Sequence, residues 1–312
     1  MNHGKVIIAG GSGFLGVSLA RRLTDAGYEV FILSRKPLPP GVPARYLHWD
    51  GKTLGAWALE LDGATAIVNM TGKNVNCRYT TAALTEINSS RVDSVHAVGE
   101  AIRACRFPPP VWVQASSLAY YGDAGDTVCD ETAPLGDGIP PDTCQRWERA
   151  FHQETTPHTR KVLFRISFVL GNGGGARGML TGLTKFFLGG AIGSGRQYIS
   201  WLHFEDMDRL WQRAIEDGAM SGTYNITGPN AVTNADFMRE MRRVLSRPWS
   251  PPLPAFLVPA GCFFLRTEPV LALTGRRCIP ARLTQEGFEF RYPHLREALE
   301  NLFHQHPTKP KS

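Results

Sequence analysis

The chain has 312 residues, of which 43% are hydrophobic and 20% are charged, and this ordinary globular composition excludes wholesale disorder. Its formal net charge of +6 favours anionic ligands such as a dinucleotide phosphate. The charge is also compatible with nucleic acid, but no nucleic-acid-binding motif accompanies it, so we expect no such partner. The six cysteines are scattered with no C-x-x-C pair, which predicts reduced thiols, a cytoplasmic protein and no metal site.

The first predicted elements are a strand, a glycine-rich turn and a helix. Residues 6–9 are an apolar run, and residues 10–16 read G-G-S-G-F-L-G before a helical pattern begins. A strand that leads through such a turn into a helix N-terminus can hold a pyrophosphate. Gly10 permits the tight turn, Gly13 lets the backbone approach the phosphates, and Gly16 lets the helix pack against the sheet. The alternative is an ordinary strand–helix turn that holds no ligand.

The second predicted strand, residues 30–33, indicates which nucleotide is preferred. It ends in Ser34-Arg35-Lys36 and carries no carboxylate at its tip. A carboxylate there would bind the adenosine ribose and repel a 2′-phosphate, whereas a hydroxyl, a guanidinium and an ammonium suit that phosphate. We therefore predict NADP(H) rather than NAD(H), with a solvated basic strand end as the alternative.

Strand and helix patterns then alternate, which predicts a parallel sheet covered on both faces. The remaining predicted strands are residues 44–49, 64–70, 111–115, 161–170 and 224–226. The predicted helices are residues 17–26, 80–106, 147–153, 204–218 and 233–246, the last with Thr233 or Asn234 as N-cap. Residues 248–254 are too rich in proline for either element. The most apolar late run, residues 256–265, is too short to span a membrane, so we expect no membrane partner.

The spacing of the three glycines, G-x-x-G-x-x-G, resembles the extended, epimerase-like branch of the short-chain dehydrogenase/reductase superfamily. The polar loop that ends the fourth strand resembles the superfamily's loop near the adenine and ribose. At the carboxyl edge of a doubly wound sheet, such a loop can line the nucleotide. Met70, Thr71 and Gly72 are therefore expected to contact it, and the alternative is a turn that satisfies its own backbone.

The end of the fifth strand reads S-S-L-A-Y-Y-G and resembles the superfamily's S-S-x-x-x-Y-G segment, in which a serine hydroxyl polarises the substrate carbonyl or alcohol. The resemblance implies Ser117 for this role, with Ser116 as the neighbouring candidate and a capped strand end as the alternative. The superfamily's general acid, the tyrosine of a Tyr-x-x-x-Lys motif, is expected near residues 140–144 but is absent there. Tyr120 or Tyr121 is the candidate replacement, although strand-end tyrosines more often pack and hydrogen-bond.

The resemblance extends over essentially the whole chain to an atypical, uncharacterised group of epimerase-family proteins with a C-terminal domain of unknown function. The segments that carry it are residues 34–36, 120–122, 146–148, 165–175, 193–197, 201–203, 280–283 and 287–290. It implies that the nucleotide is contacted by Gly10, Ser12, Gly13, Phe14, Leu15, Ser34, Arg35, Met70, Thr71, Glu86 and Arg91. Arg91 is then a cation facing the cofactor, with a surface ion pair as the alternative. His203 is either a proton shuttle or, more often for such a residue, structural.

Together these features predict a Rossmann-like, doubly wound α/β fold with a smaller, interleaved substrate lobe. We expect the dinucleotide-binding part in residues 1–170 with 202–226 returning to it, the lobe in 171–201 and 227–303, and a tail in 304–312. The predicted function is an NADP(H)-dependent oxidoreductase or epimerase for an unknown small molecule, and the long helices of this fold suit a homodimer. The alternative is an NADP(H)-binding sensor without turnover, which the missing tyrosine–lysine pair favours.

Overall fold

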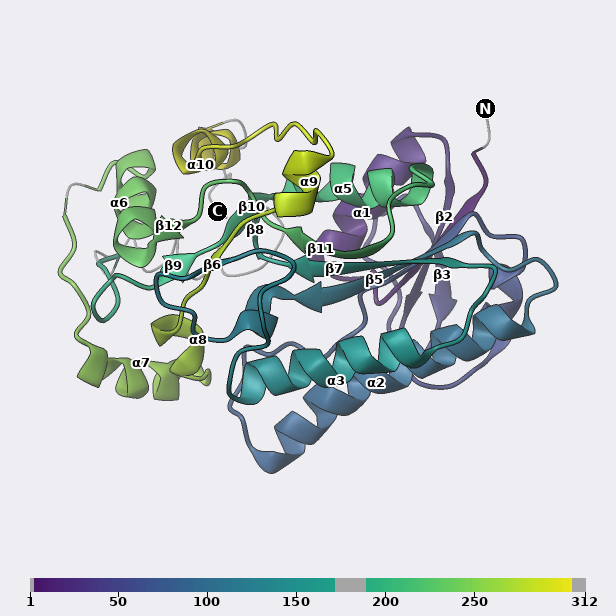
Figure 1. Cartoon of the computed structure of the whole chain (residues 1–312), viewed down its shortest axis with the longest axis horizontal. Coiled ribbons are helices and arrows are strands. Elements are labelled where there is room, and N and C mark those ends of the chain that lie inside the picture. The colour runs from purple at the N-terminus through teal and green to yellow at the C-terminus, as the bar shows by residue number, and fades with distance from the viewer. Residues whose placement is uncertain (1–2, 172–188, 248, 305–312) are drawn as a thin grey trace.

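A seven-stranded parallel sheet forms the centre of the molecule (Figure 1). The computed structural model describes residues 3–171, 189–247 and 249–304 and places the strands in the order β11-β7-β5-β4-β1-β2-β3. Their bounds are Lys5–Ala9 (β1), Glu29–Ser34 (β2), Arg45–His48 (β3), Ala66–Asn69 (β4), Val111–Ser117 (β5), Arg160–Ile166 (β7) and Gly222–Ile226 (β11). Each neighbouring pair is parallel, which confirms the predicted doubly wound fold.

Helices cover both faces of this sheet, and this explains why the central strands carry continuous apolar runs such as residues 6–9 of β1 and 66–68 of β4. Helices α1 (Phe14–Asp25) and α5 (Phe204–Glu216) lie on one face, and α2 (Thr81–Ala104) and α3 (Ile139–Gln153) lie on the other (Figure 1). Residues 6–9 of β1 and all four residues of β4 have no exposed surface. The sheet core is therefore closed on both sides, and ligands are expected at the carboxyl ends of the strands.

Two predicted elements differ from the observed ones. The strand predicted for residues 161–170 is two strands, because the chain leaves the sheet after β7 and β8 (Phe168–Leu170) pairs instead with β10 (Trp201–His203). The helix predicted for residues 147–153 begins eight positions earlier, at Ile139. Pro140 and Pro141 occupy its first turn, where a missing backbone N–H breaks no helical hydrogen bond.

Most of the remaining elements gather beyond one end of the sheet (Figure 1), whereas η1 (Ala56–Leu61) packs on α2 and in the sheet core. Two short pairs are formed by β6 (Val128–Cys129) with β13 (Arg277–Cys278) and by β9 (Tyr198–Ile199) with β12 (Val232–Thr233). The helices are α6 (Asn234–Val244), α7 (Val258–Leu265), α8 (Val270–Leu273), α9 (Ala281–Gln285) and α10 (Leu295–His304), with 3-10 turns η1 (Ala56–Leu61), η2 (Leu118–Tyr121) and η3 (Ala255–Leu257). The Thr233 side chain caps α6, and Thr233 is one of the two residues predicted as its N-cap.

Parts of the predicted loop at 171–175 and of the predicted tail lie outside the described residues. The division into lobes at the predicted boundaries stays a prediction. None of the helices within the described ranges is long and apolar enough to cross a lipid bilayer.

One contact between α1 and α5 is buried and titratable. The Ser18 hydroxyl donates to Asp208 Oδ2 at 2.5 Å, while Asp208 Oδ1 has no hydrogen-bond partner among the described residues. Asp208 is only 5% exposed. Burial raises the pKa of its carboxyl to about 7, against the opposing effect of the Ser18 hydrogen bond.

We expect Asp208 to make the protein less stable as the pH rises from about 4 to 7. In this window the folded state keeps a proton that the unfolded state has lost, so the free energy of unfolding falls by up to about 1.4 kcal/mol per pH unit. Asp208→Asn removes the titrating group and should flatten this slope. Urea unfolding of the native protein and of Asp208→Asn at pH 5 and pH 7.5 measures how the free energy of unfolding of each changes with pH. An equal change in the two proteins would contradict the raised pKa of Asp208.

Candidate functional site

The candidate site lies where the strand order reverses, between the carboxyl ends of β1 and β4. A cleft of about 470 Å³ opens at this point. It is lined by Gly10, Ser12, Gly13, Leu33, Ser34, Arg35, Trp49, Asp50, Gly51, Lys52, Met70, Thr71, Gly72, Lys73, Glu86, Ser89, Ser90 and Asp93. Most of the residues predicted to contact a nucleotide are thus brought together along one surface.

The glycine turn after β1 forms one wall of the cleft. Gly10 has a φ of +72°, and a Cβ there would lie 2.7 Å from the Thr71 backbone. A Cβ on Gly16 would lie 2.3 Å from the Gly11 backbone, so this glycine lets α1 pack against the turn itself. A Cβ on Gly13, at the N-terminus of α1, would meet no atom within 4 Å. Gly13 therefore keeps open space where an anion can approach the helix N-terminus.

The loop after β4 forms the opposite wall, and Asn69 fixes its shape. The fully buried Asn69 side chain donates from Nδ2 to Gln114 Oε1 at 3.0 Å, and its Oδ1 accepts from the Thr71 N–H at 3.1 Å. Thr71 lines the cleft, and its buried hydroxyl has no hydrogen-bond partner among the described residues. A buried hydroxyl without a partner is costly unless a ligand satisfies it.

The ends of β2 and β3 form the third wall. Arg35 is exposed, lines the cleft and makes no ion pair within the described residues, while the Ser34 hydroxyl donates to the Lys36 carbonyl at 2.5 Å. Asp50, which belongs to no recognisable sequence motif, also lines this end. Its Oδ1 accepts hydrogen bonds from the N–H groups of Lys52 and Thr53, each at 2.9 Å. Slight burial raises the pKa of the Asp50 carboxyl, but the hydrogen bonds have the larger combined effect and lower it.

The other residues predicted to contact the nucleotide lie differently. Leu15 packs against the sheet core. Phe14 packs against the Gly171 backbone and, together with Ser12 and Gly13, lines an adjoining hollow of about 950 Å³. Glu86 lines it but forms an ion pair with Lys73. Arg91 lies behind Gly72, where its Nη1 donates to the carbonyl oxygens of Lys73 at 3.1 Å and Ile87 at 2.9 Å.

Ser117 faces a second, smaller cavity of about 110 Å³. Its lining is mostly apolar: Val75, Tyr79, Leu84, Ile87, Arg91, Ser117, Ala119, Ile139, Pro140, Thr143, Cys144, Trp147 and Leu271. The Ser117 hydroxyl accepts the Ala119 N–H at 3.1 Å, so this residue caps η2 at the strand end and also lines the cavity. The cavity reaches the site expected for Tyr-x-x-x-Lys, where Pro140 and Cys144 stand instead.

Ser116 and Tyr121 do not line either cavity, because both belong to a buried ion-pair network. Arg165 on β7 donates bidentately to Glu148 on α3, at 3.0 and 2.8 Å. The Ser116 hydroxyl donates to the same carboxylate at 2.6 Å. Arg165 Nη1 also donates to the Tyr121 hydroxyl at 2.8 Å, and that hydroxyl donates to Asn225 Oδ1 at 2.7 Å. Burial raises the pKa of Tyr121, although Arg165 opposes this effect.

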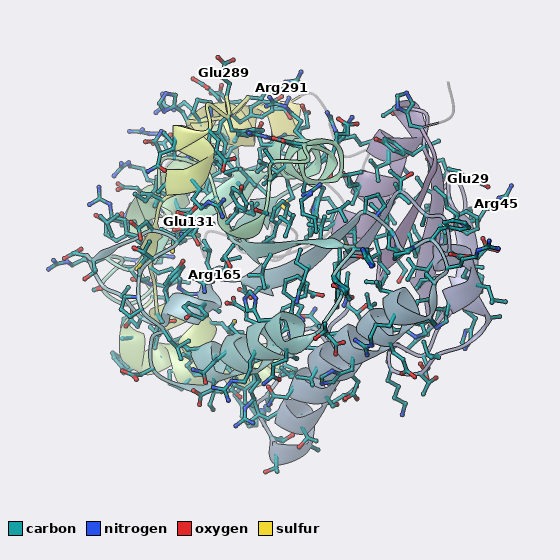
Figure 2. The ribbon with its side chains drawn as sticks, turned by 45° about the vertical axis from the view of Figure 1, so that its right-hand side comes forward. Glu29, Arg45, Glu131, Arg165, Glu289 and Arg291 are labelled. Atoms are coloured by element: carbon teal, nitrogen blue, oxygen red, sulfur yellow. The ribbon has the colours of Figure 1, made fainter. Side chains whose placement is uncertain are left out.

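This network lies in the interior of the molecule, and the two remaining candidates, Tyr120 and His203, also have partners. Figure 2 shows Arg165 inside the molecule and the Glu29–Arg45 ion pair at its outer edge. The Arg165 guanidinium lies 3.5 Å from the centre of the Tyr120 ring, a cation–π contact. His203 is fully buried, caps α5 and stacks on Tyr292 at 3.9 Å, and burial lowers its pKa to about 4. The structural alternative for His203 fits this geometry.

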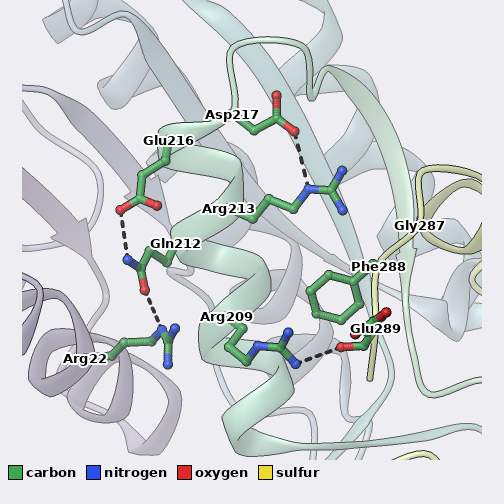
Figure 3. A pocket seen from close by; sticks show the side chains of 9 residues that line it. All are labelled: Arg22, Arg209, Gln212, Arg213, Glu216, Asp217, Gly287, Phe288 and Glu289. Atoms are coloured by element: carbon green, nitrogen blue, oxygen red, sulfur yellow. Dashed lines mark hydrogen bonds and ion pairs between the residues drawn. The ribbon is translucent and has the colours of Figure 1, made fainter. Parts of the chain in front are cut away.

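A third hollow lies away from the carboxyl edge, between α1, α5 and residues 287–289 (Figure 3). It contains three arginines, but each has partners within the hollow. Arg22 donates to Gln212 at 2.6 Å, Arg209 to the Glu289 carbonyl at 2.8 Å, and Arg213 to Asp217 at 3.3 Å. These arginines are therefore paired with residues of the hollow itself, and their hydrogen bonds hold the surface together. Among the described residues, no cluster of three or more histidine, cysteine, aspartate or glutamate side chains is placed to hold a metal ion.

The fold and the glycine cleft define a dinucleotide-binding protein of the epimerase type, and sequence comparison agrees. The model of the NAD dependent epimerase/dehydratase family matches residues 6–227, and a domain of unknown function, DUF1731, matches residues 253–302. The chain therefore belongs to the NAD dependent epimerase/dehydratase family, as the sequence resemblance predicted.

Relatives match over almost the entire length. The bovine epimerase family protein SDR39U1 is 33% identical over 303 residues, which covers 96% of this chain and 99% of that protein. The human SDR39U1 structure, solved with NADPH, superposes with a TM-score of 0.84 at 31% identity and covers 96% of this chain and 98% of that chain. A nucleoside-diphosphate sugar epimerase from Corynebacterium glutamicum gives a TM-score of 0.74 at 27% identity, covering 96% of this chain and 58% of that chain.

We expect Tyr121→Phe to destabilise the protein rather than change what it binds. The substitution leaves Asn225 Oδ1 and one Arg165 donor without a partner in a buried place, which costs about 1–3 kcal/mol. Tyr46→Phe is the control, because its hydroxyl contacts only exposed His48. Urea unfolding followed by circular dichroism measures the difference, and equal stability of the two variants would contradict a structural role.

Proposed function

We propose that this chain binds NADP(H) in the cleft between β1, β2 and β4 and is an oxidoreductase for the carbonyl or alcohol group of a small molecule. The observation that carries the proposal is the unfilled space beside Gly13, joined along one cleft to the unpaired Thr71 hydroxyl and to Arg35. These are the groups that a pyrophosphate, a ribose and a 2′-phosphate need. The NADPH held by the human relative supports the same assignment.

The residues fit the cofactor at each end of the cleft. The N-terminus of α1 and the open backbone at Gly13 suit the pyrophosphate. Arg35 suits the 2′-phosphate, because it is exposed and unpaired within the described part of the chain, whereas the Asp50 carboxylate beside it is engaged in its own turn. Trp49 adds an apolar wall. When bound, the cofactor supplies a hydride to a carbonyl carbon or accepts one from an alcohol.

Ser117 is the serine that we assign to the substrate oxygen. Its hydroxyl lines the apolar cavity, whereas the Ser116 hydroxyl is engaged by Glu148. A hydroxyl that donates to a carbonyl oxygen polarises the bond and stabilises the charge that develops there. The second candidate function, an NADP(H)-binding sensor, rests on the cavity wall at Pro140 and Cys144, where no tyrosine–lysine pair stands.

Arg35→Ala should weaken the binding of NADPH by roughly 10- to 100-fold and leave the binding of NADH nearly unchanged. A charged hydrogen-bond partner of the 2′-phosphate is lost, and NADH has no such phosphate. Arg45→Ala is the matched control, because this exposed arginine pairs with Glu29 at the sheet edge (Figure 2). Titration of the cofactor's fluorescence gives both affinities. An equal loss for the two cofactors would sink the 2′-phosphate assignment.

Turnover separates the oxidoreductase from the sensor. We expect the protein to oxidise NADPH in the presence of a panel of small carbonyl compounds and sugar nucleotides, and Ser117→Ala to lower that rate by at least tenfold while NADPH affinity stays the same. Absorbance at 340 nm measures the rate. NADPH binding without oxidation by any compound favours the sensor, and an unchanged rate in Ser117→Ala removes this serine from the mechanism.

A further inference from the structure

The cavity in front of Ser117 holds an acid and a cation that do not come from α3. The ionisable side chains that line it are Tyr79, Arg91 and Cys144. The Cys144 side chain is only 4% exposed, whereas Tyr79 is partly exposed, so Tyr79 is the more accessible of the two proton donors to a ligand. Tyr79 comes from the loop between β4 and α2, and Arg91 comes from α2.

Tyr79 and Arg91 interact electrostatically within this cavity. Burial raises the pKa of Tyr79 to about 12, nearby Cys77 and Glu268 add to this rise, and the Arg91 cation opposes it. The phenol is therefore protonated at neutral pH, and the phenolate left after proton donation is stabilised by a positive charge. Arg91 is fixed in place by its two backbone carbonyl partners and lies 5.0 Å from the centre of the Trp147 ring.

We propose that Tyr79 is the proton donor of the reaction and that Arg91 is the cation beside it, so that the two replace the missing Tyr-x-x-x-Lys pair from a different part of the fold. The proposal rests on the proposed NADP(H)-dependent function. In the reduction, the carbonyl carbon takes a hydride from NADPH, and the carbonyl oxygen takes the Tyr79 proton. The products are an alcohol, NADP⁺ and a Tyr79 phenolate that water reprotonates.

The C-terminal part of the chain holds Tyr79 in position. The Tyr79 N–H donates to Glu268 Oε1 at 2.6 Å, and Arg78 donates to the Phe263 carbonyl at 3.1 Å. Thr267 and Asn76 form a further hydrogen bond between the same two segments. Glu268 is thus a positioning residue, because it fixes the backbone that carries the phenol.

The walls of the cavity indicate the class of substrate. Apart from the polar groups described above, the walls consist mainly of apolar side chains such as Leu84, Ile87, Trp147 and Leu271. An apolar cavity of about 110 Å³ favours a small carbonyl compound with an apolar substituent over a sugar, whose hydroxyls would find few partners here.

Steady-state kinetics with NADPH and three probe carbonyls, benzaldehyde, cyclohexanone and hexanal, tests the assignment. Tyr79→Phe should lower kcat by about a hundredfold or more and leave the Kd of NADPH unchanged. Tyr46→Phe should leave both unchanged, because its hydroxyl pairs with His48 on the sheet edge. Glu268→Ala should lower kcat about tenfold, and Glu268→Gln, which keeps the acceptor oxygen, should restore it. A normal kcat in Tyr79→Phe overturns the proposal.

A second readout does not need turnover. In protein labelled with 3-fluorotyrosine, the fluorine signal of Tyr79 is assigned by its absence from Tyr79→Phe. We expect NADP⁺ to move this signal, and 2′-phospho-ADP-ribose, which lacks the nicotinamide, to move it much less. If NADP⁺ binds and the signal does not move, or if both ligands move it equally, the proposal fails while the proposed cofactor binding stands. If NADP⁺, 2′-phospho-ADP-ribose and NADPH all fail to bind, the proposed function fails, and this inference fails with it.

Discussion

The buried pair of Arg165 and Glu148 is the interaction on which the geometry of the site depends. It joins β7 to α3, and through Ser116 and Tyr121 it also holds the end of β5 and the turn η2. Although burial works against the cation, Glu148 raises the pKa of Arg165, so the guanidinium stays protonated. Removing one partner of such a pair leaves an uncompensated buried charge and costs about 3–5 kcal/mol. The network therefore fixes where Ser117 lies.

Alternation along β5 explains how two adjacent serines acquire different environments. Successive side chains of a strand point to opposite faces, so Ser116 reaches Glu148 while Ser117, at the strand end, lines the cavity. The sequence places both serines in one motif, and only the resemblance to the superfamily segment favours Ser117 over Ser116. The choice depends on Glu148 and Arg165, which lie 32 and 49 positions beyond Ser116. Their contact with this serine is a property of the folded chain.

The parts of the fold that follow from local pattern were predictable. The apolar runs of β1, β2 and β4 and the long stripe of α2 agree with the observed elements to within a few residues. The start of α3 was missed because Pro140 and Pro141 look like helix breakers when their position within the helix is unknown. The departure of β8 from the sheet was missed because residues 161–170 are a continuous strand pattern, and only the pairing with β10 separates them.

The residues of the site likewise fall into those that a local sequence pattern predicts and those that only tertiary packing brings together. The glycine turn and the end of β2 are local motifs, so their residues could be named in advance. By contrast, Asp50 and Tyr79 sit in loops without a motif, and tertiary packing alone brings them to the two cavities. Arg91 was expected to face the cofactor, but Gly72 separates it from the cleft: a Cβ on this glycine would lie 3.1 Å from the Arg91 guanidinium carbon. Arg91 therefore contacts the back of the nucleotide loop and the cavity of Ser117 together.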